Sequence, residues 1–524
     1  VVSRNALNFT TLQAGTVGGN FAGSRIGSLN ILIDGINVQD NRINSGVYST
    51  SGASVDIIEE FRVVVSPADA EYGRGSGQIQ ARTRSGTNNF HGSAFELHRN
   101  TVLNANTWFN NQRGLDRNGD PVSPRNRLVR NEYGGRIGGP IKRNKTFFHF
   151  NYEATRQATR GAVTTTVLTA NARNGQYRFF PNARNGNSEA AIPTVDLNGN
   201  PVRPAGAGDL QTVNLFSVDP ARSVPDPTGT TRRFLGFTPL PNNFRFGDGL
   251  NTAGYTWSRP GLYTSGLYRF KLDHNFNSNH RAELSWQRDS DNDVNGFQAQ
   301  PYPTAPGGTV TSWTHFLSVG VDSTLSPRLL NQVRAGFNRP WVRFNSPWEL
   351  VGRDALGQQG NSVFFPAFLS FTNPLVDQDP QGRISPVYQF GDTVSYTAGK
   401  HNLRAGGEVR WVSSNGFNSF SVVPRANIGS GVLSATPVNN IPLIGVNNGL
   451  ASNILNDLTG TITSKVQAFN ATGGANPQFV PGEPRQRTWR QRELSWFFKD
   501  DWKFSRTLTL NMGIRWDYYG VPYE

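Results

Sequence analysis

Segments in which apolar and polar residues alternate, joined in turn by short and long connections, constrain the fold of this chain most strongly. In the last of them, every second residue from Leu508 to Tyr518 is apolar, and the residues between are polar or small. This period places one apolar and one polar face on a β-strand. About eleven such segments follow residue 90. They span residues 91–99, 131–139, 146–156, 263–275, 280–289, 313–324, 329–339, 387–397, 402–412, 491–502 and 507–518.

The connections between these segments alternate in length. The short ones are residues 140–145, 276–279, 325–328, 398–401 and 503–506, and the long ones are residues 100–130, 157–262, 290–312, 340–386 and 413–490. A soluble β-sandwich has no reason to alternate short and long connections so regularly. An outer-membrane barrel does, because it has tight turns on one rim and long loops on the other. The segment lengths also suit tilted strands of about 9–11 residues that cross a bilayer. We therefore predict a mainly β fold with antiparallel transmembrane barrel strands.

Hydropathy excludes a helical membrane protein. Mean hydropathy is -0.48, and the chain has no apolar stretch of the roughly 18 residues that a spanning helix needs. Aromatic residues gather near the ends of predicted strands, where a membrane barrel places an interfacial girdle. The residues are Tyr263, Trp313, Trp341, Trp502, Tyr518 and Tyr519. The alternative is that these rings form the core of a soluble β protein.

The charge balance does not indicate nucleic-acid binding. The chain has 51 Lys and Arg against 37 Asp and Glu, a formal net charge of +14. The excess is scattered along the chain rather than clustered, and the first 90 residues are neutral. We interpret it as an arginine-rich surface that faces anionic lipid headgroups or anionic solutes.

No pattern of an enzyme active site occurs. The chain lacks the H-E-x-x-H, G-x-S-x-G, G-x-G-x-x-G and Walker A motifs, and it has no cysteine. We expect no enzymatic activity and no resident cofactor. The segments Asp116–Asp120 and Asp289–Asp293 place oxygen donors at alternate positions, as calcium loops do, but both lack the Glu that closes an EF-hand loop. Surface calcium and ordinary polar turns both stay open there.

Residues 1–90 follow a different, mixed pattern, which predicts a separate small domain before the barrel strands of 91–524. A short buried strand, Ile31–Ile33, ends in the turn Asp34-Gly35. A second strand covers Phe61–Val65. The segment Glu71–Gly77 follows, and its alternating glycines permit positive φ and close approach of the backbone to a neighbour.

Four pieces of this region, taken in order, resemble the plug and first barrel strand of TonB-dependent outer-membrane transporters, specifically the Oar-like group. The pieces are Ile31–Ile36, Ile58–Val63, Ser66–Ile79 and Thr83–Ser93. The resemblance implies a plug domain inside a barrel of about 22 strands. It also implies location in the outer membrane of a Gram-negative-type bacterium and import driven by an inner-membrane complex through the TonB protein.

The same resemblance implies that the chain is a fragment. The family's TonB box lies upstream, as does a carboxypeptidase-regulatory-like domain in Oar-like members, and neither precedes Val1 here. About eleven strands are half of the family's number, and an open sheet edge in lipid is not tolerated. We therefore expect residues 1–90 to be an N-terminally truncated plug and residues 91–524 to be a C-terminally truncated barrel.

In this family the loop after the Asp-Gly strand contributes to the substrate site, which corresponds to Asn37–Ser54 here. Its amide, guanidinium and phenol groups are suited to hydrogen-bond a polar solute such as an oligosaccharide, a peptide or a metal chelate. The alternative is that they only solvate an outward loop. The candidate substrate-binding residues are Arg25, Asp40, Asn41, Arg42 and Tyr48, and the structural plug motif consists of Asp34, Gly35, Glu71, Tyr72, Gly73, Gly75 and Gly77.

One departure from the family concerns the end of the second plug strand. Many siderophore transporters have Arg-Gly-Pro there, whereas this chain has Val65-Ser66-Pro67. An ion pair between plug and barrel through that arginine is therefore not expected, and a siderophore is disfavoured as the solute.

Two rival functions stay open at this level. The chain could belong to a surface adhesin or polysaccharide-binding protein that does not transport, with Asn- and Gly-rich loops such as Asn439–Asn456 as binding elements. A soluble β-rich polysaccharide enzyme is disfavoured, because it would not expose apolar strand faces such as that of Leu508–Tyr518.

Overall fold

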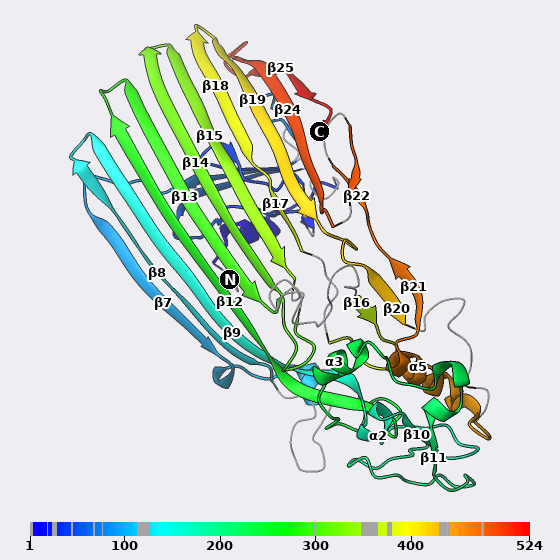
Figure 1. Cartoon of the computed structure of the whole chain (residues 1–524). Coiled ribbons are helices and arrows are strands. Elements are labelled where there is room, and N and C mark those ends of the chain that lie inside the picture. Colours follow the sequence, from blue (N-terminus) through cyan, green and yellow to red (C-terminus); the bar gives the residue numbers. More distant parts are fainter. Residues whose placement is uncertain are drawn as a thin grey trace.

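A large antiparallel sheet dominates the computed structural model (Figure 1). The model describes residues 4–17, 19–23, 29–42, 46–65, 69–75, 77–112, 125–296, 299–346, 365–374, 380–428, 438, 441–472, 476–480 and 482–524. Among these residues the sheet has 12 strands, and its neighbours follow the order β25-β24-β19-β17-β15-β14-β13-β12-β9-β8-β7. β18 lies end to end with β17, between β15 and β19.

The predicted alternating segments are all strands of this sheet. The strands are β7 (His91–Asn100), β8 (Arg127–Lys142), β9 (Thr146–Leu168), β12 (Thr252–Asn275), β13 (His280–Val294), β14 (Thr309–Ser326), β15 (Leu329–Asn345), β17 (Gln381–Ile384), β18 (Val387–Ala398), β19 (His401–Asn418), β24 (Arg485–Trp502) and β25 (Leu510–Tyr519). Most extend beyond the prediction on the side of the long connections, where polar side chains occur on both faces and the apolar alternation fades.

The two faces of the sheet differ as the alternation predicts. On one face Leu494, Trp496 and Phe498 are 41%, 46% and 45% exposed, as expected of side chains that contact lipid. We call this the outward face and the opposite one the concave face. Trp313 and Trp341 stack on the outward face with ring centroids 5.5 Å apart.

Two rings of the predicted girdle lie on the concave face instead, so that part of the girdle prediction is wrong. The Tyr263 hydroxyl donates to Asp291 at 2.7 Å. Tyr519 lines a cavity between the N-terminal domain and the concave face. The reason is that alternate residues of a strand point to opposite faces. A ring at a strand end therefore lies on the outward face only if it is an even number of residues away from the other outward side chains of that strand.

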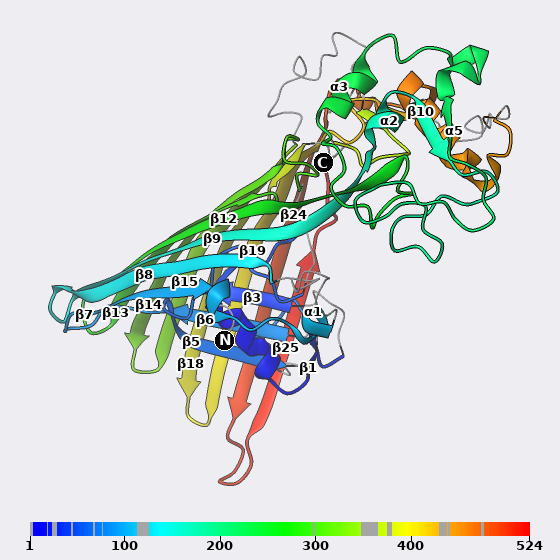
Figure 2. The ribbon, with the colours of Figure 1, turned by 90° about the horizontal axis from the view of Figure 1, so that it is seen from below.

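The N-terminal domain (residues 4–83) lies against the concave face of the large sheet (Figure 2). Its four-stranded mixed sheet has the order β4-β3-β6-β5, and β3 and β6 are parallel. Ile31, Ile33, Ile36 and Ile79 are fully or almost fully buried in its core. Its elements are η1 (Ala6–Leu12), β1 (Thr16–Val17), β2 (Asn20–Phe21), β3 (Leu29–Ile33), β4 (Ile36–Asn37), β5 (Ile58–Val65) and β6 (Gly77–Thr83).

Two of the long connections fold together into a region that we call the loop domain. Residues from the segments 168–250 and 368–458 share one apolar core, which includes Leu168, Tyr177, Phe234, Phe371 and Ile454. Its elements are α2 (Ala170–Arg173), β10 (Gln176–Phe179), β11 (Gln211–Asn214), η3 (Leu215–Ser217), η4 (Pro220–Arg222), α3 (Thr230–Gly236), β16 (Phe365–Ala367), β20 (Arg425–Ile428), η6 (Gly445–Asn447), α5 (Asn448–Thr459) and β21 (Ile462–Val466). The sequence predicted connections here, not a second core.

The remaining elements are short. They are η2 (Thr101–Leu103), α1 (Trp108–Gln112), β22 (Asn470–Ala471) and β23 (Phe479–Val480). Within the described ranges, none of the helices combines the length and the apolar character required to span a membrane.

Candidate functional site

The turn between β3 and β4 presents a carboxylate to the concave face. Asp34 and Gly35 both have positive φ, 45° and 82°, which an Asp-Gly pair in a tight hairpin turn favours. The Asp34 carboxylate accepts hydrogen bonds from the Thr83 amide at 2.9 Å and the Thr83 hydroxyl at 2.6 Å. It also accepts one from the Ser285 hydroxyl of β13 at 2.8 Å. The turn therefore joins β6 of the N-terminal domain to the large sheet.

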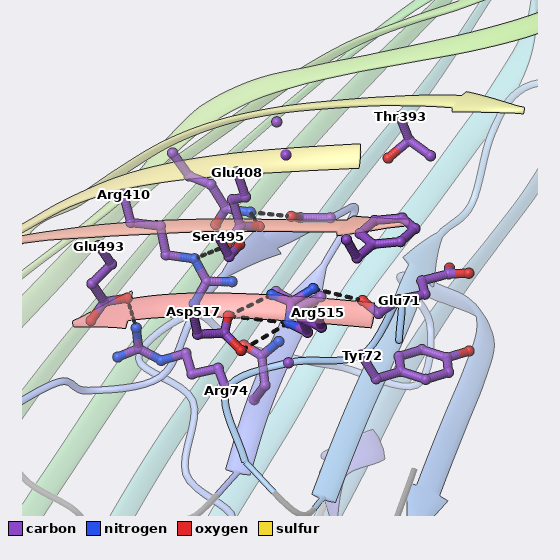
Figure 3. Close-up of a pocket in the computed structure, with 18 of the residues that line it drawn as sticks. Glu71, Tyr72, Arg74, Thr393, Glu408, Arg410, Glu493, Ser495, Arg515 and Asp517 are labelled. Carbon is purple, nitrogen blue, oxygen red and sulfur yellow. Dashed lines mark hydrogen bonds and ion pairs between the residues drawn. The ribbon is translucent and has the colours of Figure 1, made fainter. Parts of the chain in front are cut away.

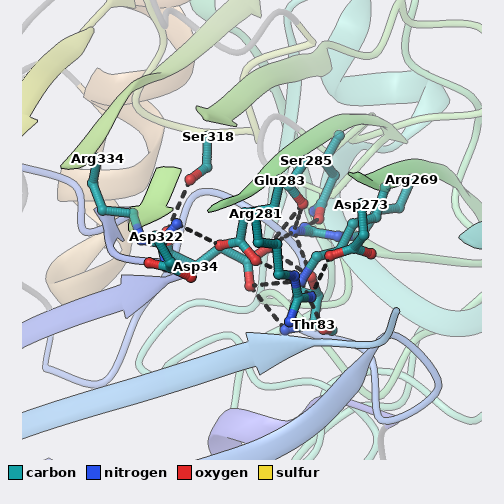
Figure 4. A network of polar contacts seen from close by, with 12 residues as sticks. Asp34, Thr83, Arg269, Asp273, Arg281, Glu283, Ser285, Ser318, Asp322 and Arg334 are labelled. Carbon is teal, nitrogen blue, oxygen red and sulfur yellow. Dashed lines mark hydrogen bonds and ion pairs between the residues drawn. The ribbon is translucent and has the colours of Figure 1, made fainter. Parts of the chain in front are cut away.

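Two cations of β12 complete this contact (Figure 4). The Arg269 guanidinium donates to the Asp34 carboxylate at 2.5 Å, and the Lys271 ammonium lies 3.8 Å from it; the side chains of all three are 1% exposed. Burial alone would raise the pKa of Asp34, but the charges of Arg269 and Lys271 and the hydrogen bonds from Thr83 hold it below its ordinary value. Asp34 is therefore ionised at neutral pH.

A second set of ion pairs joins the segment after β5 to β19 and β24. Arg404 donates to Glu71 at 2.5 Å, and Lys499 donates to Asp69 at 2.7 Å. Arg74 forms an ion pair with Glu493 of β24 (Figure 3). The glycine-rich segment thus carries a charged side chain before and after its first glycine, and each meets an opposite charge on the sheet.

A cavity of about 250 Å³ lies between this segment and the sheet. Arg515 of β25 projects across it, forms an ion pair with Asp517 at 2.8 Å, and donates to the backbone oxygen of Glu71 at 3.3 Å. A Cβ atom on Gly73 would lie 2.1 Å from the Arg515 guanidinium. Gly73 therefore permits the close approach that the alternating glycines predict.

Asp40, Asn41 and Arg42, in the loop that follows β4, lie closer to the end of the large sheet that carries the long connections. Arg383 donates to Asp40 at 3.0 Å, and Arg42 donates to the Ser414 hydroxyl at 3.3 Å. Asp40 is 6% exposed, so its carboxylate is buried against the large sheet. Asn41 accepts a hydrogen bond from Arg74 at 2.6 Å.

A larger cavity, of about 650 Å³, contains Tyr48, another of the predicted substrate-binding residues. Tyr48 is 49% exposed. Three carboxylates of β13, those of Asp289, Asp291 and Asp293, line the cavity on the sheet side. Glu132, Glu153, Arg4 and Arg130 are further lining residues. Acidic groups therefore outnumber basic ones on the described walls.

The predicted substrate-binding residues do not form one cluster. Tyr48 lines the larger cavity, whereas Asp40 and Arg42 face β17 and β19. Arg25 lies outside the described residues, as do Ser66 and Pro67 of the segment that departs from the family. Asp40 and Arg42 thus contact the sheet, as do Asp34, Asp69, Glu71 and Arg74 of the same domain.

The predicted calcium segments give different outcomes. Asp116–Asp120 lies outside the described residues. Asp289, Asp291 and Asp293 share one face of β13, and the part of the chain that the structure describes holds no group of three or more His, Asp or Glu suited to a metal ion. Alternate residues on one face of a strand are about 6–7 Å apart, which is too far for one ion to bridge all three carboxylates.

Sequence reasoning missed the residues of the sheet that hold the N-terminal domain. Arg269 and Lys271 of β12 and Ser285 of β13 contact Asp34. Asp273 and Glu283, on the same face, pair within the sheet with Arg281 and Lys271. Charged residues at every second position of otherwise apolar strands could have predicted these contacts. A charge on the lipid side is costly, so such residues are expected to point inward, where they need a partner.

Comparison with known proteins agrees with this architecture. Residues 82–524 match the family model described as an outer membrane beta barrel domain. The TonB-dependent transporter Oar of Myxococcus xanthus is 29% identical to this chain over 119 residues, which are 22% of this chain and 10% of that protein.

Similar solved structures include three outer-membrane proteins. The transporter YddB from Escherichia coli has a TM-score of 0.48 at 10% identity, and the siderophore receptor PirA from Acinetobacter baumannii has 0.43 at 11%. The ferric enterobactin receptor PfeA from Pseudomonas aeruginosa has 0.42 at 12%. Each alignment covers 94% of this chain and 49–50% of the other, so this chain spans about half the length of these proteins.

Proposed function

Because this chain belongs to the outer membrane β-barrel family, we propose that it is part of a TonB-dependent transporter that imports a polar solute. The protein is located in the outer membrane of a Gram-negative-type bacterium. The observation that carries the proposal is the N-terminal domain held on the concave face through the buried pair of Asp34 and Arg269. In a complete barrel, a folded domain in that place would obstruct the lumen, as a plug does. The likeness to the transporter Oar supports the same function.

In this mechanism the solute binds to the side of the plug that faces the long connections. Tyr48 supplies a phenol at the larger cavity, and the β13 carboxylates supply hydrogen-bond acceptors. The proposal includes Arg25, Asp40, Asn41 and Arg42 as further solute-binding residues. TonB then pulls or remodels the plug, so that the ion pairs to the sheet break and a passage opens. Transport of this kind requires no covalent chemistry.

The test is accumulation of labelled solutes by cells that express the complete protein. Oligosaccharides, peptides and metal chelates are supplied in turn, with and without a protonophore that removes inner-membrane energy. We expect one class to accumulate only in energised cells. Arg42→Ala with Tyr48→Ala should lower that accumulation about 5- to 150-fold if the two side chains bind the solute, since two lost hydrogen bonds correspond to about 1–3 kcal/mol. Unchanged uptake by this variant would remove these residues from the site.

A second function, surface adhesion or polysaccharide binding without transport, is favoured by the loop domain. Its apolar core includes Tyr177, Phe234 and Ile454, each at most 2% exposed, so the long connections form a folded unit rather than simple loops. The same experiment separates the two functions. An adhesin retains its ligand at the cell surface whether or not the inner membrane is energised, and deletion of TonB leaves that binding unchanged.

A further inference from the structure

Arginines on the outward face of the large sheet lack the acidic partners that arginines on the concave face have. Arg156, Arg288, Arg339, Arg490 and Arg492 are exposed, and in the described part of the chain none of them forms an ion pair with a carboxylate. We call these five residues the arginine band. On the concave face, by contrast, Arg269, Arg334, Arg383 and Arg404 are all ion-paired.

Strand register places the central members of the band side by side. Arg288 of β13 is opposite His315 of β14, and His315 is opposite Arg339 of β15. Arg288 and Arg339 are thus two strands apart, about 10 Å, with a further ionisable side chain between them. The outward positions of β13, β14 and β15 include no Asp or Glu among the described residues. Arg288 and Arg339 are both positive, and an anion from outside the chain would neutralise them.

The band lies at a defined depth. On β15 the outward residues from Leu329 to Phe337 are apolar apart from Asn331, and Arg339 comes next. Leu329 to Phe337 is nine residues, within the about 9–11 residues with which a tilted strand crosses the hydrocarbon core. On β24 the outward residues Trp496 and Leu494 are likewise followed by Arg492.

The aromatic rings around the band fit the same depth. Trp313 and Trp341 stack immediately beyond His315 and Arg339, and the Arg339 guanidinium lies 5.9 Å from the Trp313 ring centroid. Aromatic rings of this kind mark the boundary between hydrocarbon and headgroups. The arginine band therefore lies at headgroup level, on the rim of the long connections.

We propose that the arginine band binds the phosphate groups of anionic lipids in the outer leaflet. Guanidinium groups suit this ligand because they are always charged and donate two parallel hydrogen bonds to a phosphate. The site lies on the face opposite the N-terminal domain, and it does not depend on import. The lipid would supply the counter-anion that the chain lacks, and it would hold the sheet at a fixed depth in the membrane.

The test uses the complete protein, extracted from its outer membrane in a mild non-ionic detergent and titrated with soluble short-chain lipids. The probes are dihexanoyl phosphatidic acid, dihexanoyl phosphatidylcholine and inorganic phosphate. The variants are Arg288→Asn with Arg339→Asn, and the control is Arg184→Asn, which removes an exposed arginine of the loop domain. Thermal unfolding of each variant establishes that it is folded.

We expect phosphatidic acid to bind, phosphatidylcholine to bind much more weakly, and the double variant to bind phosphatidic acid about thirtyfold more weakly than the parent, because two arginines near an anionic surface are removed. The control should bind like the parent. Equal binding of the two lipids by the parent would overturn the proposal, and this comparison needs no variant. Inorganic phosphate that binds as tightly as the lipid, or a folded double variant with unchanged affinity, would also overturn it.

Discussion

At the scale of single residues, the carboxylate of Asp34 connects the N-terminal domain to the sheet. It is buried with Arg269 and Lys271, and the loss of one partner leaves the others as unpaired buried charges. Such a loss costs about 3–5 kcal/mol. We expect Asp34→Asn to lower the free energy of unfolding by about 3 kcal/mol, measured by denaturant titration of the protein in detergent.

The control for this variant is Asp209→Asn, in the exposed pair that Asp209 forms with Arg203 at 2.7 Å. Water screens that pair, so its loss should change the free energy of unfolding by less than about 1 kcal/mol. If the two variants unfold at the same denaturant concentration, Asp34 does not anchor the domain as described.

A second residue, Asp457 in α5, makes the loop domain sensitive to pH. Burial raises the pKa of Asp457 to about 6, although its carboxylate accepts hydrogen bonds from the Leu369 and Ser370 amides and from the Ser370 hydroxyl. In the unfolded chain the pKa of an Asp is about 3.9. Between these values the folded state binds more protons than the unfolded state, so stability increases as pH falls from about 7 to 4.

The expected gain is about 3 kcal/mol, and it should be absent in Asp457→Asn, which has no proton to bind. The measurement is the opening free energy of the Leu369 and Ser370 amides, from hydrogen exchange corrected for the intrinsic rate at each pH. Equal pH dependence in the parent and in Asp457→Asn would contradict the prediction.

At the scale of elements, Gly86 lies in the junction between β6 and β7. A Cβ atom there would be 2.3 Å from the backbone oxygen of Phe148 and 2.8 Å from that of Gly139. Backbone atoms of a β-hairpin cannot move away cheaply, so the junction itself would have to shift. We expect Gly86→Ala to destabilise the protein by about 1–3 kcal/mol, measured as a lower midpoint of denaturant unfolding.

The matched control is Gly236→Ala at the end of α3, where nothing lies within 4 Å of the added atom. Alanine in a helix has less unfolded-state entropy to lose than glycine, so this change should be neutral or slightly stabilising. A midpoint for Gly86→Ala that equals that of Gly236→Ala would show that the junction has more space than its geometry indicates.

At the scale of the whole molecule, the proposed transport requires that the N-terminal domain move relative to the sheet. The Ser51 hydroxyl donates to the Asn338 side-chain oxygen across this interface at 2.9 Å, and the chain has no cysteine of its own. We expect Ser51→Cys with Asn338→Cys to form a disulfide in the complete protein and to abolish uptake until it is reduced. Each single variant serves as a control, and uptake that persists in the oxidised double variant contradicts movement of the domain.

The strands of the large sheet could be predicted from the sequence because their signal is local. Alternation from Leu508 to Tyr518, or from Leu494 to Phe498, follows directly from the strand geometry and from having lipid on one side. The Asp34-Gly35 turn was predictable for the same reason, since the two positive φ angles belong to two adjacent residues.

Tertiary structure alone decided which charges meet. Asp34 and Arg269 are 235 residues apart, and Glu71 and Arg404 are 333 apart, so no local pattern relates them. The same applies to the loop domain, where Tyr177 and Ile454 share a core although barrel strands separate them in the chain. Periodicity thus determined the strands and their two faces, because each depends only on neighbouring residues. The arrangement of the strands and of the N-terminal domain in space determined the partners on those faces, because an ion pair or a packed core depends on distance in space.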